Sequence, residues 1–485
     1  MGKSGVELPM NRPNLIYIVA DQLRLTSLGY TGDKRAQTHH IDALRAESLS
    51  FCNAVSGHPV CAPYRASLFT GKYTTGTGMV INEIRLNPAH HPRCFAHVLD
   101  EAGYECSYLG KWHLWADQLG NHYDPKNSFV PPGPDRLGFN GYFAHYNFHH
   151  NFYGAAAYYH RDTPEKIYTS GYEPDAQTDM AIAELERLSA GNKPFAFFFS
   201  PGTPHDPWVP ENVPGECLER FNDTAFPLPE NYLPENDPYA DNWSKLSDRE
   251  RSELPSWMRV YYAMTANLDG NIGKLTMALK RLGLYNNTII VFTSDHGELF
   301  GAHGRRAKNI FYDEAVRVPF LMRWKGCLQE GSTSDVCLNT ADIMPTLLAL
   351  MDIPVPDAVE GTSVKDCILG ISGAAEPDGA LMMSTGATAN FEDGHEWRAF
   401  RTKSHTYAVY RVDNKELLFD NIADPLQMHN IAGDPAHKAV KNDLREKMLA
   451  AMQQIGDTFE ACSWYEKNWV RDRHIIRTAG TGGRK

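Results

Sequence analysis

Cys61 stands in a sequence setting that suggests chemistry. It opens the stretch CAPYRASLFTG, which has Arg65 four positions later, and the next cysteine along the chain is Cys94. The residues after Cys61 predict a helix that begins near Pro63, which places the thiol at a helix N-terminus, where backbone N–H groups favour an anion. An isolated cysteine is more often an inert buried thiol. A structural thiol, however, does not need Arg65, and a redox thiol needs a closer partner.

The other reactive side chains follow apolar runs of strand length. Asp21 follows 14–20, Lys111 and His113 follow 105–109, His205 follows 194–200 after a short loop, and Asp295 follows 287–293. In open α/β sheets, ligands bind outside the carboxyl ends of the strands. Four such positions, far apart in the sequence, therefore predict one shared site.

The elements that must position this site alternate between strand and helix. Helical patterns cover 41–48, 95–102, 178–188, 257–282 and 340–350, and a further strand is expected at 318–324. This alternation, with nearly continuous apolar strands, predicts an α/β fold with a large, mostly parallel sheet sandwiched by helices. The segment 371–379 reads as a connection. We expect a catalytic domain over 1–375 and a smaller C-terminal α+β subdomain with an antiparallel sheet over 376–485.

Composition restricts the partners and the cellular setting. The formal net charge of -12 argues against nucleic acid, which needs a basic face. It argues only weakly against an anionic substrate, because distant charges are screened and a local basic pocket can dominate. The nine cysteines lack paired spacing, the N-terminal residues lack an apolar signal region, and there is no run of 18 apolar residues. We therefore expect a cytoplasmic protein that spans no membrane, or an exported one if a leader has been removed.

Seven stretches resemble type I sulfatases of the alkaline-phosphatase-like superfamily. Cys61 to Arg65 matches the C-x-P-x-R signature of that family. The stretches occur in the family's order: IYIVADQLR, THHIDALRAESLSF, CAPYRASLFTGKY, GYECSYLGKWHL, PGTPHDPW, IVFTSDHGELFGAHG and LLFDNIADPLQMHNIAG. Together they extend along most of the chain.

The resemblance implies that Cys61 is a precursor. In the family, a maturation enzyme oxidises this cysteine to formylglycine, which hydrates to a geminal diol. One hydroxyl attacks the sulfur of a sulfate ester, and the other then loses a proton and expels sulfate, which regenerates the aldehyde. This is covalent catalysis that divides one hard step into two easier ones. Arg65 would orient the diol and neutralise nearby negative charge.

The resemblance also implies one divalent cation. Asp21 and Gln22 match the family's first metal-binding pair, Asp295 and His296 match the later pair, and the modified Cys61 completes the set. The commonest family pattern has Asp and Asn where Gln22 and His296 stand. Imidazole suits softer ions, yet we place Ca²⁺ first on family grounds, with Mn²⁺ or Mg²⁺ as alternatives. Taken alone, the sequence Asp-His-Gly is also compatible with a capped turn.

Four cationic or titratable side chains match the family's sulfate-binding positions: Lys111, His113, His205 and Lys308. The resemblance implies that the two lysines bind sulfate oxygens and that His113 handles a diol proton. It implies that His205 binds a sulfate oxygen and assists the leaving group. Arg305 and Arg306 are competitors for the role of Lys308. An isolated lysine is usually a solvated surface charge, and His205 between two prolines could be an ordinary loop residue. Together, these side chains would form the locally basic pocket that the overall charge lacks.

The sequence says less about specificity. Four aromatic residues near the motifs could stack on a sugar or aryl ring, although core packing is the commoner role: Tyr64, Trp112, Trp115 and Trp208. The aromatic segment 142–160 could line the pocket through His149, His150 and Tyr153.

The leading hypothesis is a sulfatase acting on an aryl sulfate or a sulfated carbohydrate. A phosphonate monoester or phosphodiester hydrolase of the same superfamily is the alternative, because such enzymes resemble this chain in using formylglycine with Asp-Gln and Asp-His pairs. A catalytically inactive binding protein is disfavoured because every expected position holds a competent residue. A thiol-dependent phosphatase is disfavoured because Arg65 does not fit the C-x5-R spacing. The expected partners are the ester and the maturation enzyme; an oligomer is possible.

Overall fold

The computed structural model describes residues 12–153, 157–160 and 162–480, and its centre is an eight-stranded sheet. The strands lie in the order β11 (Thr333–Ser334), β2 (Leu49–Phe51), β10 (Phe320–Arg323), β9 (Thr288–Ser294), β1 (Asn14–Ala20), β8 (Phe195–Ser200), β4 (Glu105–Lys111) and β5 (Phe143–Tyr146). All neighbouring pairs are parallel except the two made by β10. The predicted mostly parallel α/β sheet is confirmed.

Both faces of the sheet are covered, which explains why its strands are apolar without interruption. Side chains alternate across a strand. In β1, Leu15 and Tyr17 belong to one core cluster and Ile16 and Ile18 to another. The first cluster draws on helices α2 (Cys61–Thr70), α4 (Phe95–Glu101) and α10 (Thr340–Leu350). The second draws on α1 (His39–Ala46), α6 (Glu173–Ser189) and α8 (Asp248–Arg281).

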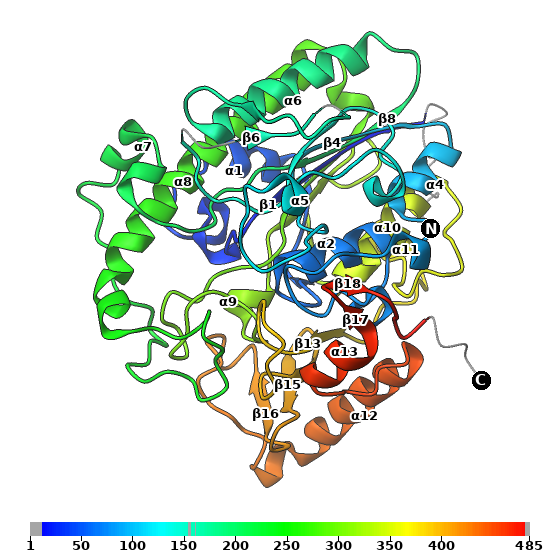
Figure 1. The fold of residues 1–485 in the computed structure, drawn as a ribbon. Helices are drawn as coiled ribbons and strands as arrows, with labels where there is room; N and C mark the ends of the chain where they lie inside the picture. Colours follow the sequence, from blue (N-terminus) through cyan, green and yellow to red (C-terminus); the bar gives the residue numbers. More distant parts are fainter. Residues whose placement is uncertain (1–11, 154–156, 161, 481–485) are drawn as a thin grey trace.

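The C-terminal part of the chain forms a second, antiparallel sheet. Its strands, in order, are β13 (Ala380–Ser384), β14 (Trp397–Arg401), β15 (His405–Tyr410) and β16 (Glu416–Asp420). Helix α12 (Lys438–Gln454) packs on this sheet through Leu444 and Met448. In Figure 1 this sheet, α12 and α13 (Cys462–Trp469), coloured orange to red, lie together at one end of the molecule. The domain boundary at residue 375 remains a prediction.

Short elements complete the described chain. They are β3 (Ala54–Val55), α3 (Thr74–Thr77), α5 (Pro125–Ser128), β6 (Ala157–Tyr158), β7 (Ile167–Tyr168), α7 (Gly215–Glu219), α9 (Asp313–Val316), β12 (Leu338–Asn339), α11 (Lys365–Ile368), β17 (Val470–Arg471) and β18 (His474–Ile475). Within the described ranges, no helix combines the length and the apolar character that a membrane span requires.

Several elements differ from the sequence prediction. Helix α6 begins at Glu173 rather than at 178, and strands β2, β5 and β11 of the main sheet were not predicted. Helix α8 begins at Asp248 rather than near residue 257, because Ser247 and Glu250 form a capping box that starts it earlier and Pro255 is accommodated inside it. Strand β13 was not predicted. It follows the expected connection directly and is an edge strand that pairs only with β14.

Candidate active site

Four neighbouring strands, β9, β1, β8 and β4, deliver the predicted side chains to one edge of the sheet. Asp21 and Asp295 directly follow β1 and β9, whose last residues are paired across the sheet. Lys111 ends β4, and His205 lies in the loop after β8. Cys61 is the first residue of α2, two positions before the predicted helix start. The structure therefore brings together residues that are hundreds of positions apart.

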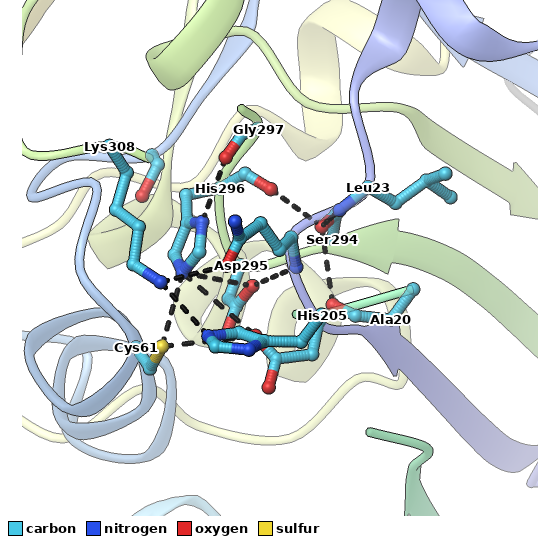
Figure 2. Close-up of polar contacts among 12 residues, drawn as sticks. Ala20, Leu23, Cys61, His205, Ser294, Asp295, His296, Gly297 and Lys308 are labelled. Carbon is cyan, nitrogen blue, oxygen red and sulfur yellow. Dashed lines mark hydrogen bonds and ion pairs between the residues drawn. The ribbon is translucent and has the colours of Figure 1, made fainter. Parts of the chain in front are cut away.

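Asp21, Cys61, Asp295 and His296 form a buried cluster. One potential ligand atom from each lies within 4.8 Å of the others. The Sγ atom of Cys61 is 3.1 Å from Nε2 of His296 and 3.8 Å from Oδ1 of Asp21. Figure 2 shows the side chains of His296, Lys308 and His205 pointing toward the sulfur of Cys61. These are four of the five residues that the sequence assigns to a metal; the fifth is Gln22.

The hydrogen bonding of His296 suits a metal ligand. Its Nδ1 lies 3.0 Å from the carbonyl oxygen of Gly297, which can only accept, so Nδ1 carries the proton. Nε2 is left with its lone pair, and it faces Asp21 and Asp295 at 3.9 and 3.6 Å. Burial lowers the pKa of His296 to about 4, which keeps the imidazole neutral. A neutral imidazole oriented by a backbone carbonyl is a common metal-ligand arrangement.

The two carboxylates of the cluster have opposite electrostatic environments. Burial and, after it, the neighbouring charge of Asp21 raise the pKa of Asp295 to about 6. Burial also acts to raise the pKa of Asp21, but the charges of Lys111 and Arg65 hold it well below its ordinary value. Two buried carboxylates that oppose each other's ionisation fit a cation between them, because the cation would favour both charged forms. The residues present therefore fit a divalent metal.

Gln22 is held by a residue that the sequence analysis missed, Glu298. The carboxylate of Glu298 accepts hydrogen bonds from Nε2 of Gln22 at 2.6 Å and from the backbone N–H groups of Phe300 and Ala307. This contact fixes the orientation of the Gln22 amide, because its oxygen Oε1 then faces Nζ of Lys308 at 2.8 Å. The backbone N–H of Gln22 donates to Asp295 at 3.0 Å. Glu298 could have been noted as an acidic residue in the loop that leaves β9.

Arg65 contacts the cluster through the carboxylate of Asp295. Its guanidinium donates to Oδ2 of Asp295 at 3.3 Å, and to the carbonyl of Lys111 and the hydroxyl of Ser200 at 2.7 Å each. The ammonium of Lys111 lies 2.5 Å from the carboxylate of Asp21. These two cations thus hold the carboxylates in place, which is a supporting role in addition to the expected one.

Lys308 and His205 form the other side of the site. Nζ of Lys308 lies 3.0 Å from Nε2 of His205, and Nδ1 of His205 lies 2.9 Å from the carbonyl of Asp206. Burial and the charge of Lys308 lower the pKa of His205 well below its ordinary value, so the ring is neutral. Burial would lower the pKa of Lys308, but the nearby acidic groups of Cys61 and Asp206 raise it above its ordinary value. The pair therefore carries one positive charge.

His113 has two buried ring nitrogens without a hydrogen-bond partner. Its ring stacks on Phe148, with centroids 5.1 Å apart. Burial and the charge of Lys111 lower its pKa, so the ring is neutral. Buried polar atoms are nearly always paired in native proteins, so unpaired ones beside a cavity point to a bound group.

A cavity of about 160 Å³ opens over these residues. The predicted residues that line it are Gln22, Cys61, His113, His150, His205, Trp208 and Lys308. Sequence reasoning missed Glu83, His122, Phe148 and Trp243 there, and it named Arg306 only as a competitor of Lys308. Glu83, His122 and Trp243 lie outside the quoted motifs, whereas Phe148 lies in the aromatic segment 142–160 that was expected near the pocket.

The remaining aromatic and basic candidates lie elsewhere. Tyr64, Trp112 and Trp115 are buried in the main core, so a stacking role is wrong for them. His149 pairs with the buried Glu173 at 2.8 Å. Tyr153 does not line the cavity; residues 154–156 of the aromatic segment lie outside the described part of the chain. Arg305 is bound to Asp237 at 2.9 Å.

Sequence comparison identifies the family. A model of the sulfatase family matches residues 13–353, which is more than half of the chain. The chain belongs to the sulfatase family. A second model, described as the C-terminal region of N-sulphoglucosamine sulphohydrolase, matches residues 301–454. As a sulfatase, the protein is a sulfuric ester hydrolase, as predicted.

Individual relatives agree with this assignment. An ulvan-active sulfatase of Formosa agariphila is 37% identical over 462 residues, which cover 94% of this chain and 84% of the relative. A solved structure described as a complex with its substrate D-glucosamine-2-N,6-O-disulfate shares the fold, with a TM-score of 0.79 at 24% identity over 92% of this chain and 99% of that one. A phosphonate monoester hydrolase of Agrobacterium radiobacter also shares the fold, with a TM-score of 0.70 at 24% identity over 92% and 96%.

Proposed function

We propose that this sulfatase hydrolyses the sulfate ester of a sulfated carbohydrate through a formylglycine made from Cys61 and one divalent cation. The observation that carries the proposal is the position of Cys61. Its Sγ lies beside Asp21 and His296 of the candidate metal cluster, and the side chains of Lys308 and His205 point toward it. A nucleophile for a sulfate ester needs these two environments, one to hold a cation and one to hold the anion.

The chain's own residues supply the electrostatic part of catalysis. Hydrated formylglycine would supply the nucleophilic hydroxyl, and the cation would supply positive charge for that group and the sulfate. Lys308 is a preorganised positive charge that needs no reorientation when an anion arrives. Its raised pKa keeps it protonated at neutral pH. The unpaired nitrogens of His113 are placed to bind an oxygen that enters the cavity.

The leaving group needs a proton, and the geometry indicates its source. His205 holds its own proton on Nδ1, and its Nε2 accepts from Lys308. A proton on Nζ of Lys308 therefore lies one hydrogen bond from the imidazole nitrogen that faces the cavity. We assign general-acid catalysis to this pair rather than to His205 alone.

Calcium remains our first assignment for the cation, with Mn²⁺ or Mg²⁺ as alternatives. Two carboxylates and the amide oxygen of Gln22 are oxygen ligands of the kind that calcium prefers. The imidazole of His296 favours a softer ion. Metal analysis of protein expressed with each ion would decide between them.

A carbohydrate ester is supported by the curated relatives, which include an ulvan-active sulfatase and an N-acetylglucosamine-6-O-sulfatase. The alternative is a phosphonate monoester hydrolase, which Gln22 and His296 favour. The neighbour with that activity is only 24% identical and supports a common fold alone. A cytoplasmic location, the maturation enzyme as a partner and an oligomer remain predictions.

The deciding experiment uses protein expressed together with a formylglycine-generating enzyme. Mass spectrometry of the peptide that contains Cys61 should show the aldehyde. The matured protein should release sulfate from sulfated sugars faster than it cleaves an aryl phosphonate monoester. An unmodified thiol that still supports full turnover, or a preference for the phosphonate, would contradict the proposal.

A further inference from the structure

Exposure increases from the bottom of the cavity to its mouth. Cys61, Lys308 and His205 at the bottom are 1%, 5% and 7% exposed, whereas Trp243, which also lines the cavity, is 44% exposed. The bottom has the charges that suit a sulfate group. We expect the part of the substrate that carries the sulfate to lie at the mouth, which Trp243 helps to line.

Trp243 is an exposed aromatic side chain held on a fixed turn. The buried carboxylate of Asp241 accepts hydrogen bonds from the N–H groups of Ser244 at 2.9 Å and Thr388 at 2.6 Å. The carbonyl of Ser244 accepts from the N–H of Arg306 at 2.9 Å, and its hydroxyl lies 3.3 Å from the carbonyl of Lys308. The turn is thus tied to the segment that carries Lys308. A backbone held in this way loses little freedom when a ligand binds.

The charges at the mouth do not favour a second anion. The guanidinium of Arg306 is paired with Glu250 at 2.9 Å and donates to the carbonyl of Trp243. The carboxylate of Glu83 lies 3.5 Å from His122 and accepts from the N–H of Gly120. Arg306 therefore already has an acidic partner, and so does the imidazole of His122. Glu83 and His122 instead offer polar atoms that hydrogen-bond hydroxyl groups.

We propose that Trp243 is the platform on which the sugar ring of the substrate stacks, with the sulfate held below it by Lys308. This inference rests on the proposed carbohydrate sulfatase activity and names the residue that selects the ring. An aromatic face beside a few polar groups is the usual composition of a small-molecule site. The volume of about 160 Å³ is smaller than the roughly 300–1,000 Å³ typical of ligand pockets, so little more than one ring fits within it.

The test compares matured wild-type enzyme with Trp243→Ala and Trp243→Phe. A monosulfated hexosamine probes the whole site, and inorganic sulfate, used as a competitive inhibitor, probes only its bottom. Trp243→Ala should raise the KM for the sugar by about tenfold, and by at least fivefold more than it raises the inhibition constant of sulfate. Trp243→Phe should restore most of the affinity. The matched control is Trp464→Ala, because Trp464 is also exposed but lies on α13 and does not line the cavity.

The outcomes separate this inference from the proposed function. An unchanged KM in Trp243→Ala, or equal losses for sugar and sulfate, overturns the platform while wild-type turnover still supports the carbohydrate sulfatase. A wild-type enzyme that hydrolyses no sulfated sugar overturns both. Loss of sugar affinity in Trp464→Ala as well would assign the effect to general destabilisation and also overturn the platform.

Discussion

The side chains of Cys61 and His296 meet, with Sγ and Nε2 3.1 Å apart, although 235 positions separate them in the sequence. Cys61 comes from the start of α2, and His296 comes from the loop after β9. Their contact joins the residue that would be modified to the residues that would hold the metal. A substitution at either residue is therefore expected to affect both the nucleophile and the metal site.

Replacing Cys61 with alanine should abolish turnover and leave the fold intact. We expect kcat to fall by more than about 10⁴-fold, because no other side chain can supply the nucleophile. Losing one small buried group should cost only about 1 kcal/mol of unfolding free energy. Turnover of an aryl sulfate and the thermal midpoint would be measured on the same preparation. Turnover close to that of the wild type would remove Cys61 from the mechanism.

Asp295→Asn should weaken metal binding, because the amide keeps the shape of the carboxylate but lacks its charge. Elemental analysis should give less metal per chain than in wild type. Calcium at about 100 times its dissociation constant should stabilise the wild type by about 2.7 kcal/mol and the variant by much less. Asp206→Asn is the control, since Asp206 lies beside His205 but outside the metal cluster. Equal metal content in both variants would contradict the assignment.

Glu298→Gln should also weaken metal binding, although Glu298 lies outside the cluster. The new amide cannot accept from all three donors, Gln22, Phe300 and Ala307, as the carboxylate does. Loss of a residue that orients a ligand typically costs about 10–100-fold in metal affinity. Calorimetric titration with Ca²⁺ would measure it. Glu173→Gln, a change at another buried glutamate, should leave the affinity within about threefold if the effect is local rather than a general loss of stability.

His205→Ala and Lys308→Met should both slow esters with poor leaving groups more than esters with good ones. The reason is that the two residues share one proton at 3.0 Å. We expect losses of about 10²–10⁴-fold for sugar sulfates and smaller losses for nitrophenyl sulfate. A leaving-group series measures this directly. If both kinds of ester lose the same factor, the pair binds sulfate but does not protonate the leaving group.

Asp313→Asn should reduce stability in a pH-dependent way. The buried carboxylate of Asp313 pairs with Arg401 through two contacts of 2.9 and 3.0 Å and with Arg317 at 3.2 Å. Burial acts to raise the pKa of Asp313, but the two arginines lower it below its ordinary value of 3.8. The lowered pKa means that this stabilisation is present above pH 3.8 and is lost as the pH falls further.

The variant should therefore lose about 3–5 kcal/mol of unfolding free energy at neutral pH, because an uncompensated buried arginine remains. The difference from wild type should shrink below pH 4. Urea unfolding at several pH values measures it. Arg401 belongs to β14 and Asp313 to α9, so the pair joins the C-terminal sheet to the catalytic part. A difference that does not depend on pH would show that the carboxylate charge is not responsible.

The sequence predicted five of the eight strands of the main sheet, because strands buried on both faces read as continuous apolar runs, as at 14–20. It missed β2, β5 and β11, which have only two to four residues each. It predicted the residues at the strand ends because sheet topology brings such positions together. It missed Glu298 and Trp243, since neither lies in a periodic pattern and both act through loop contacts. The capping residues Ser247 and Glu250 indicate the early start of α8, but Pro255 argues against it because proline usually interrupts a helix.

The turn around Trp243 lies in the long connection between α7 and α8, outside every strand of the sheet. Its attachment to the catalytic segment runs through backbone carbonyls and the carboxylate of Asp241, so it does not depend on which side chain stands at position 243. With Trp243 in its proposed role, substrate choice and bond cleavage lie on separately exchangeable parts of the chain. Laboratory evolution confined to this connection would be a practical route to sulfatases with altered substrate preference.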